Sequence, residues 1–124
     1  MSSKETEDQV FSGCPVGVTL NVIGGKWKGI ILYQLLSGTK RYNELRRLQP
    51  AVTQRMLTLQ LRELEQDGIV HREVYKQIPP RVDYSLTAFG RTLEPIIVAM
   101  KEWGEHFEQD VRTQRHLCKK TDPS

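Results

Sequence analysis

The chain has 124 residues, a formal net charge of +3, 38% hydrophobic and 27% charged residues, and two cysteines. This length allows one domain with a sizeable core, and the composition is that of a soluble globular protein. It excludes a membrane-spanning protein, because no apolar run is long enough, and a disulfide scaffold of the secreted kind, because two cysteines are too few.

Residues 1–13 are expected to form a flexible N-terminal arm. They lack the apolar core of a signal peptide, so we expect a cytoplasmic protein. The apolar segment 15–23 predicts a short helix, and the glycine pair that follows is expected to end it. Cys14 would be the N-cap, and the proline that follows would occupy the first helical position, where its missing N–H costs nothing.

Residues 26–36 predict a second helix, ended by Ser37 and Gly38. Its buried face is expected to carry Trp27, Ile30, Ile31 and Leu35. Lys40 and Arg41 follow this helix and could bind backbone phosphate. A solvated basic turn explains these two residues equally well.

Residues 42–68 predict a helix-turn-helix. The first helix, 42–48, stops because Pro50 disfavours helical backbone at the residue before it. The second helix has Thr53 as its N-cap and Gly68 just after its end. Its Leu57, Leu61 and Leu64 fall within one narrow arc at 100° per residue, which predicts a buried stripe.

The opposite face of this second helix suggests a recognition helix. Its amide, hydroxyl and guanidinium groups suit base edges and phosphates. The candidate DNA contacts are Thr53, Gln54, Arg55, Thr58 and Arg62. Taken alone, such a pattern is more often the solvated face of an ordinary amphipathic helix. The neighbouring segments therefore decide between that explanation and a recognition helix.

In residues 70–75 and 82–87, apolar and polar residues alternate well enough to predict two strands. A helix-turn-helix followed by a hairpin with a basic tip predicts a wing, here residues 69–87. Lys76 and Arg81 flank the tip and are expected to meet phosphate or the minor groove. Residues 26–91 hold 12 Lys or Arg against 6 Asp or Glu, so the basic excess coincides with this region.

Residues 88–107 predict a longer helix with an apolar stripe at i, i+3, i+4 spacing, formed by Leu93, Ile96, Ile97, Met100, Trp103 and Phe107. Pro95 leaves two alternatives: a short capped segment that bends at Glu94, or a main helix that starts near the proline. The stripe fits a dimer surface and a plain core helix about equally well. The polar tail, 108–124, is expected to fray.

Three motifs in order resemble the HxlR-type family of winged-helix transcription regulators, relatives of the MarR-like repressors. They are Cys14-Pro15-Val16 with Ile23-Gly24-Gly25-Lys26-Trp27, then Arg55-Met56-Leu57-Thr58 with Leu61-Arg62-Glu63-Leu64-Glu65, then Pro79-Pro80-Arg81-Val82 with Tyr84-Ser85-Leu86-Thr87-Ala88-Phe89-Gly90.

The resemblance implies a mainly α fold with a small β-hairpin (α+β), a winged helix-turn-helix domain over residues 14–107 with N- and C-terminal dimerisation helices. It implies a homodimer on double-stranded DNA with a palindromic operator, and it favours the dimer explanation for Ile97, Met100, Trp103 and Phe107. Several family members sense oxidants, quinones or aldehydes through a cysteine at the position of Cys14. Some form a disulfide with a partner-subunit cysteine, and here Cys118 is the other cysteine.

Alternatives remain for the signal and for the function. A cysteine at a helix N-terminus is placed to stabilise a thiolate, whereas an inert buried cysteine is equally compatible, with a small-molecule ligand as the signal. A small dimer acts most simply by occlusion, so we expect a repressor. A winged-helix protein-interaction module and a thiol enzyme using Cys14 are the competing classes.

Enzyme chemistry finds little support in the sequence. There is no glycine-rich phosphate loop, no HExxH and no nucleophile elbow. His106, His116 and Cys118 have a spacing that fits no closed metal site. We therefore expect no catalytic residues, no cofactor and no metal.

Overall fold

The structure is a computed structural model, and it describes residues 13–121. Residues 1–12 of the predicted arm and residues 122–124 of the predicted tail lie outside this range. In chain order the elements are α2 (Pro15–Ile23), α3 (Lys28–Leu35), β1 (Lys40–Arg41), α4 (Tyr42–Leu48), α5 (Gln54–Gln66), β2 (Val70–Tyr75), β3 (Arg81–Leu86), α6 (Ala88–Arg91) and α7 (Glu94–Thr121). The predicted fold class, mainly helical with a small antiparallel sheet, is confirmed.

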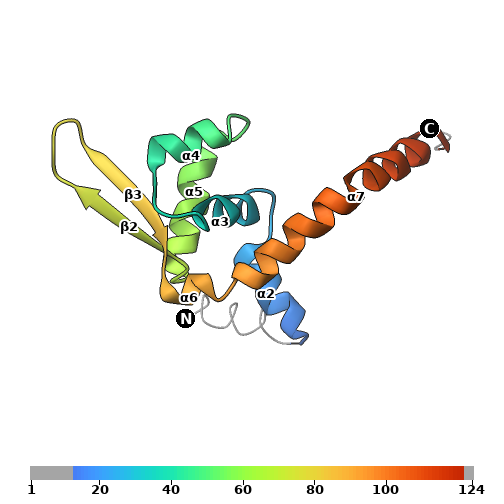
Figure 1. Cartoon of the computed structure of the whole chain (residues 1–124), viewed down its shortest axis with the longest axis horizontal. Coiled ribbons are helices and arrows are strands. Elements are labelled where there is room, and N and C mark those ends of the chain that lie inside the picture. The colour runs from blue at the N-terminus through green and yellow to red at the C-terminus, as the bar shows by residue number, and fades with distance from the viewer. Residues whose placement is uncertain (1–12, 122–124) are drawn as a thin grey trace, which may run out of the picture.

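The core lies where α3, α4 and α5 meet the sheet, as Figure 1 shows. Leu57, Leu61 and Leu64 of α5 are fully buried there, which confirms the predicted stripe. Each buried leucine contributes roughly 1.5–3 kcal/mol of apolar transfer free energy, so this stripe fixes which face of α5 points outward.

The helix α3 differs from its prediction in two ways. It begins at Lys28, two residues later than expected, and its buried face is shifted. Ile31 and Leu35 are buried as predicted, but Ile30 is exposed and Leu32 takes its place in the core. The prediction was wrong at this position because α3 is apolar on most of its circumference, which leaves the buried arc poorly defined by sequence.

The sheet has the order β1-β3-β2, with both pairs antiparallel. The wing hairpin pairs Val70 with Leu86 at its base and Tyr75 with Arg81 at its tip. Strand β1 was not predicted. It has two residues, too few to show the alternation by which strands are recognised.

Thr87 joins the end of the helix-turn-helix to the C-terminal helices. Its hydroxyl donates to the Gly68 carbonyl at 2.6 Å and accepts from the Gly90 N–H at 2.8 Å, which caps α6. Gly68 has a φ of +75°, a conformation that side chains disfavour, so a glycine suits the end of α5.

Both alternatives for Pro95 hold in part, since α6 is a short capped segment and α7 starts at Glu94 with the proline in its first turn. The expectation that the tail frays from Glu108 was wrong, because α7 is helical through Thr121. The i, i+4 ion pairs Lys101–Glu105 (2.6 Å) and Glu108–Arg112 (2.7 Å) support its exposed turns.

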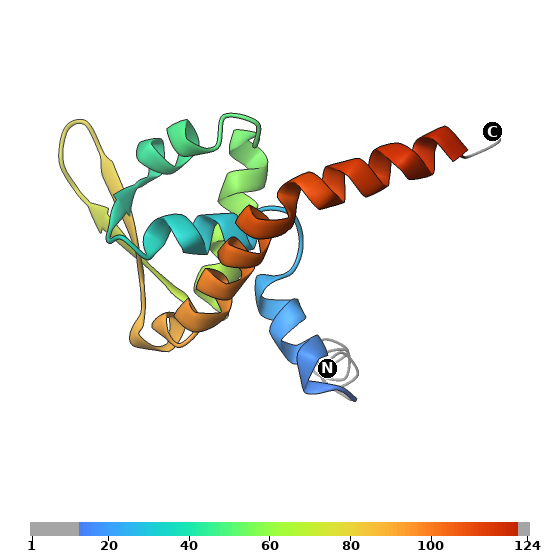
Figure 2. The same ribbon diagram turned by 45° about the vertical axis from the view of Figure 1, so that its right-hand side comes forward.

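Figures 1 and 2 show α2 and the C-terminal half of α7 projecting away from the packed body of the molecule. Within residues 13–121, no helix combines the length and apolar character needed to cross a membrane.

Candidate nucleic-acid interface

Helix α5 presents the predicted recognition surface at its N-terminal end. Thr53 caps the helix, with its hydroxyl accepting from the Met56 N–H at 3.1 Å. Gln54, Arg55 and Arg62 are exposed, and Arg55 and Arg62 lie on the side opposite the buried leucine stripe. Their amide and guanidinium donors can reach base edges or phosphates in a major groove.

Tyr42, at the start of α4, connects the helix-turn-helix to the wing. Its hydroxyl oxygen lies 3.3 Å from the Gln54 carbonyl oxygen and 3.0 Å from the Thr58 Oγ1, both on α5. Its ring centroid lies 6.4 Å from that of Tyr84 on β3. The start of α4, helix α5 and the wing are therefore joined through one side chain.

The wing places its two predicted cations in different surroundings. Arg81 donates from Nε and Nη2 to the Asp83 carboxylate at 3.0 and 2.8 Å, and its guanidinium lies 4.9 Å from the Tyr75 ring centroid. These hydrogen bonds hold the pKa of Asp83 below its usual value and raise the pKa of Arg81. Lys76 is exposed just beyond β2. Lys76 is thus better placed than Arg81 to neutralise a phosphate.

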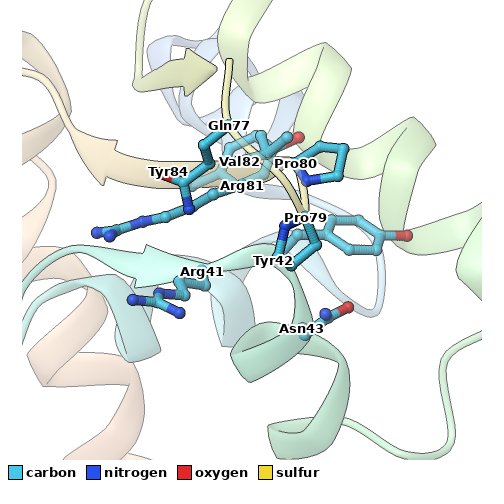
Figure 3. Close-up of a pocket in the computed structure, with 9 residues that line it drawn as sticks. All are labelled: Arg41, Tyr42, Asn43, Gln77, Pro79, Pro80, Arg81, Val82 and Tyr84. Atoms are coloured by element: carbon cyan, nitrogen blue, oxygen red, sulfur yellow. The ribbon is translucent and has the colours of Figure 1, made fainter. Parts of the chain in front are cut away.

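Lys40 and Arg41 form strand β1, and neither is part of an irregular turn. The Lys40 Nζ donates to Ser37 Oγ at 3.0 Å, and the Arg41 backbone N–H donates to Glu44 Oε1 at 2.9 Å, which caps α4. The Arg41 side chain is exposed. Figure 3 shows it extending in the same direction as that of Arg81.

A cavity of about 420 Å³ lies between the wing and the start of α4. It is lined by Arg41, Tyr42, Asn43, Gln77, Pro79, Pro80, Arg81, Val82 and Tyr84. In Figure 3, Gln77 and Pro80 lie toward the wing tip and Asn43 lies toward α4. The mixture of apolar walls and amide or guanidinium donors suits a sugar–phosphate strand.

A second, more polar hollow of about 270 Å³ lies between α5 and β2. Its lining joins Thr58 and Arg62 to a residue that the sequence did not single out, Arg72. Arg72 pairs in register with Tyr84, whose pKa is raised by burial and lowered in part by a hydrogen bond from Arg72. The available sequence signal was the position of Arg72 within an alternating strand, which does not distinguish it from other exposed charges.

The four predicted dimer residues do not share one environment. Ile97 is only 3% exposed and belongs to the protomer's own core, whereas Met100 and Trp103 are 49% and 58% exposed and Phe107 is also exposed. The rings of Trp103 and Phe107 pack together, with centroids 5.1 Å apart. Met100, Trp103 and Phe107 therefore leave an uncovered apolar strip along α7.

Helix α2 adds exposed apolar surface; from the sequence we expected it to be a dimerisation helix but assigned no interface residues to it. Val16 and Leu20, one helical turn apart, are 62% and 59% exposed. An apolar hollow of about 310 Å³ lies between α3 and α7, with Ile30 and Met100 among its walls. Such a large uncovered apolar area on a protein of this size is typical of an interaction surface.

Cys14 is exposed and has extended backbone before α2, as predicted for an N-cap, with Pro15 at the first position of the helix. Cys118 is also exposed and lies in the last turns of α7. The inert buried cysteine considered from the sequence does not describe Cys14 in this protomer.

The comparisons with known proteins agree with this geometry. Residues 22–112 match the pattern of the HxlR-like helix-turn-helix family. The HTH-type transcriptional regulator YdeP of Bacillus subtilis is 67% identical over 101 residues, which cover 82% of this chain and 79% of YdeP. The HTH-type transcriptional regulator YybR of the same organism is 68% identical over 105 residues, covering 85% and 84% of the two chains. The solved structure of the redox regulator HypR in its reduced form is 66% identical, covers 81% of this chain and 99% of that one, and has a TM-score of 0.77.

Proposed function

The chain belongs to the HxlR-like helix-turn-helix family and is a transcriptional regulator, and we propose that it binds a palindromic DNA operator as a homodimer and represses transcription. The observation that carries this proposal is the outward face of α5. A capped helix with Gln54 and Arg55 exposed at its N-terminal end lies beside a hairpin with a basic residue at its tip.

In this proposal the N-terminal half of α5 enters the major groove and the wing tip follows the adjacent minor groove. Arg55 and Gln54 read base edges, and Lys76 neutralises a phosphate. Thr53, Thr58, Arg62, Lys40, Arg41 and Arg81 complete the contact surface. The sugar–phosphate strand between the two grooves would cross the cavity beside Tyr42.

The exposed apolar residues of α2 and α7 support the homodimer. One recognition helix reads too few base pairs for selectivity, whereas a twofold dimer reads two half-sites about 34 Å, one helical turn, apart. Met100, Trp103 and Phe107 would be covered by the second subunit, together with Val16 and Leu20. A dimer bound over a promoter would repress transcription by occluding polymerase.

We further propose that Cys14 senses oxidants or electrophiles. HypR is named a redox regulator, and Cys14 is exposed at the start of a helix that the dimer would bury. Disulfide formation with Cys118 of the partner subunit would remove two electrons and two protons from the two thiols, and an oxidant such as a quinone would accept them. The resulting shift of α2 would change the separation of the recognition helices.

Selection from a random library of duplex DNA tests the operator proposal. The purified protein is expected to enrich two inverted half-sites, and Arg55→Ala is expected to enrich them poorly. Repression is then measured with a reporter gene downstream of the selected operator. Failure to enrich any sequence would favour the competing class, a winged-helix module that binds protein.

A further inference from the structure

Tyr42 is held in place by parts of the molecule other than the recognition helix. The strand residues just before it, Lys40 and Arg41, pair with Tyr84 and Asp83 of β3. Its ring lies beside that of Tyr84 and lines the same cavity as the wing-tip residue Pro79. The position of the Tyr42 hydroxyl is therefore set by the sheet and the wing.

The two contacts of this hydroxyl are both hydrogen bonds in one arrangement of the hydroxyl hydrogens. A carbonyl oxygen only accepts, so the contact with the Gln54 carbonyl uses the single hydrogen of the Tyr42 hydroxyl. The Thr58 hydroxyl, 3.0 Å away, then donates its own hydrogen to the Tyr42 oxygen. Thr58 Oγ1 is left with lone pairs and no free hydrogen, which makes it an acceptor for any further partner.

We propose that Tyr42 is a positioning residue for sequence readout, which holds Thr58 as a hydrogen-bond acceptor toward the major groove. This inference rests on the proposed DNA-binding function and deepens it. In the major groove, adenine N6 and cytosine N4 carry amino donors, whereas guanine O6 and thymine O4 are acceptors. Thr58 therefore selects adenine or cytosine at the position that it faces and rejects guanine and thymine.

Removing only the hydroxyl tests the proposal. In Tyr42→Phe the ring still packs against Tyr84, but the Thr58 hydroxyl is released and can rotate to donate. We expect discrimination between the selected base and an analogue without the exocyclic amino group to fall about tenfold. Affinity for unrelated DNA and the salt dependence of binding should change little, since the ring that lines the cavity is kept and no charged group is lost.

A double-mutant cycle separates positioning from general stabilisation. Thr58→Val keeps the shape of the side chain without the hydroxyl and should lose the same discrimination. If Tyr42 acts through Thr58, the double variant loses no more than either single variant. The proposal is overturned if the two losses add to about a hundredfold, if Tyr42→Phe discriminates as the wild type does, or if its affinity falls equally for every sequence.

Two controls keep the outcomes distinct. Tyr33→Phe removes a hydroxyl from α3, where the ring lies 5.9 Å from Lys101 Nζ, and should leave discrimination unchanged. Thr58→Ser keeps the hydroxyl and should retain the base preference, so its contrast with Thr58→Val still tests readout by the Thr58 hydroxyl if Tyr42→Phe does not fold. A wild-type protein without any sequence preference would contradict the proposed function itself, whereas an unaltered Tyr42→Phe contradicts this inference alone.

Discussion

The helix-turn-helix with its wing differs from the two terminal helices, α2 and α7, in how its apolar residues are buried. In the first region the apolar residues that the sequence aligns on α5 are buried within the same protomer. In the terminal helices, residues with the same periodicity remain exposed, among them Leu20 on α2 and Met100 and Trp103 on α7. Periodicity therefore identifies an amphipathic face without saying whether the same chain or a second one covers it.

The two regions also divide the proposed function. The first region carries donors for DNA on a scaffold whose core is complete. The second carries apolar surface and both cysteines, and only a second subunit would bury that surface. Substitutions should accordingly change base readout in the first region and assembly or its control in the second.

The largest effect is expected from a charge on the exposed strip of α7. Met100→Glu should leave the protomer folded and prevent dimerisation, which lowers operator affinity by about 10²–10⁴-fold because the half-sites then bind independently. Sedimentation and operator titration measure the two effects. Ile97→Glu is the matched contrast: this residue is buried in the protomer, so the charge should unfold the chain, seen as loss of the thermal transition. A Met100→Glu variant that remains dimeric would contradict the assignment of the α7 strip to the dimer interface.

A smaller loss is expected at the recognition surface. Arg55→Ala should weaken specific binding by about 1 to 3 kcal/mol and relax base preference, since a guanidinium can bind a guanine edge through two hydrogen bonds. The dimer and its thermal stability should not change, because Arg55 is exposed. Equal operator affinity of the variant and the wild type at matched salt would remove Arg55 from the interface.

The proposed signal should pass from the second region to the first. Diamide or a quinone is expected to change the operator affinity of the wild type by about tenfold, a usual size for coupling between sites. Cys14→Ser should abolish the response. If Cys118→Ser also abolishes it, a disulfide between subunits is the mechanism, whereas a response that persists in Cys118→Ser indicates an adduct on Cys14 alone. A response that survives in Cys14→Ser would contradict the sensor proposal.

The smallest effect concerns the wing. Lys76→Ala should reduce the slope of log affinity against log salt by about 0.9, the value for one phosphate contact. Arg81→Ala should change the slope less, because Asp83 already neutralises the guanidinium through two hydrogen bonds. Asp83→Asn in the same titration is expected to release Arg81 and steepen the slope. Equal reductions for Lys76→Ala and Arg81→Ala would show that the ion pair opens on DNA.

The sequence was most informative where local signals agreed. Thr53, the leucine stripe and Gly68 mark the start, buried face and end of α5, and the structure confirms all three. Strand β1 was missed because it is defined by pairing with β3, which has no local signature. The length of α7 was underestimated because a polar helix lacks the apolar period used to recognise one.

The candidate site was predictable only as a set of exposed donors. The contact between Tyr42 and α5 spans 16 residues in sequence, and the pairing of Arg81 with Asp83 depends on both residues lying on one face of β3. Neither follows from composition or spacing. These contacts determine which of the predicted side chains is free to bind DNA. The fold therefore had to be known before the cationic side chains could be compared by their availability to DNA.

Hydroxyl-radical footprinting on the selected operator shows whether each α5 of a twofold dimer reads one half-site. We predict two protected regions related by twofold symmetry, with their centres about one helical turn apart. At equal protein concentration, Met100→Glu should lose both regions, and Arg55→Ala should weaken both equally. A single protected region, or the wild-type pattern in Met100→Glu, would contradict a twofold dimer that reads one half-site with each α5.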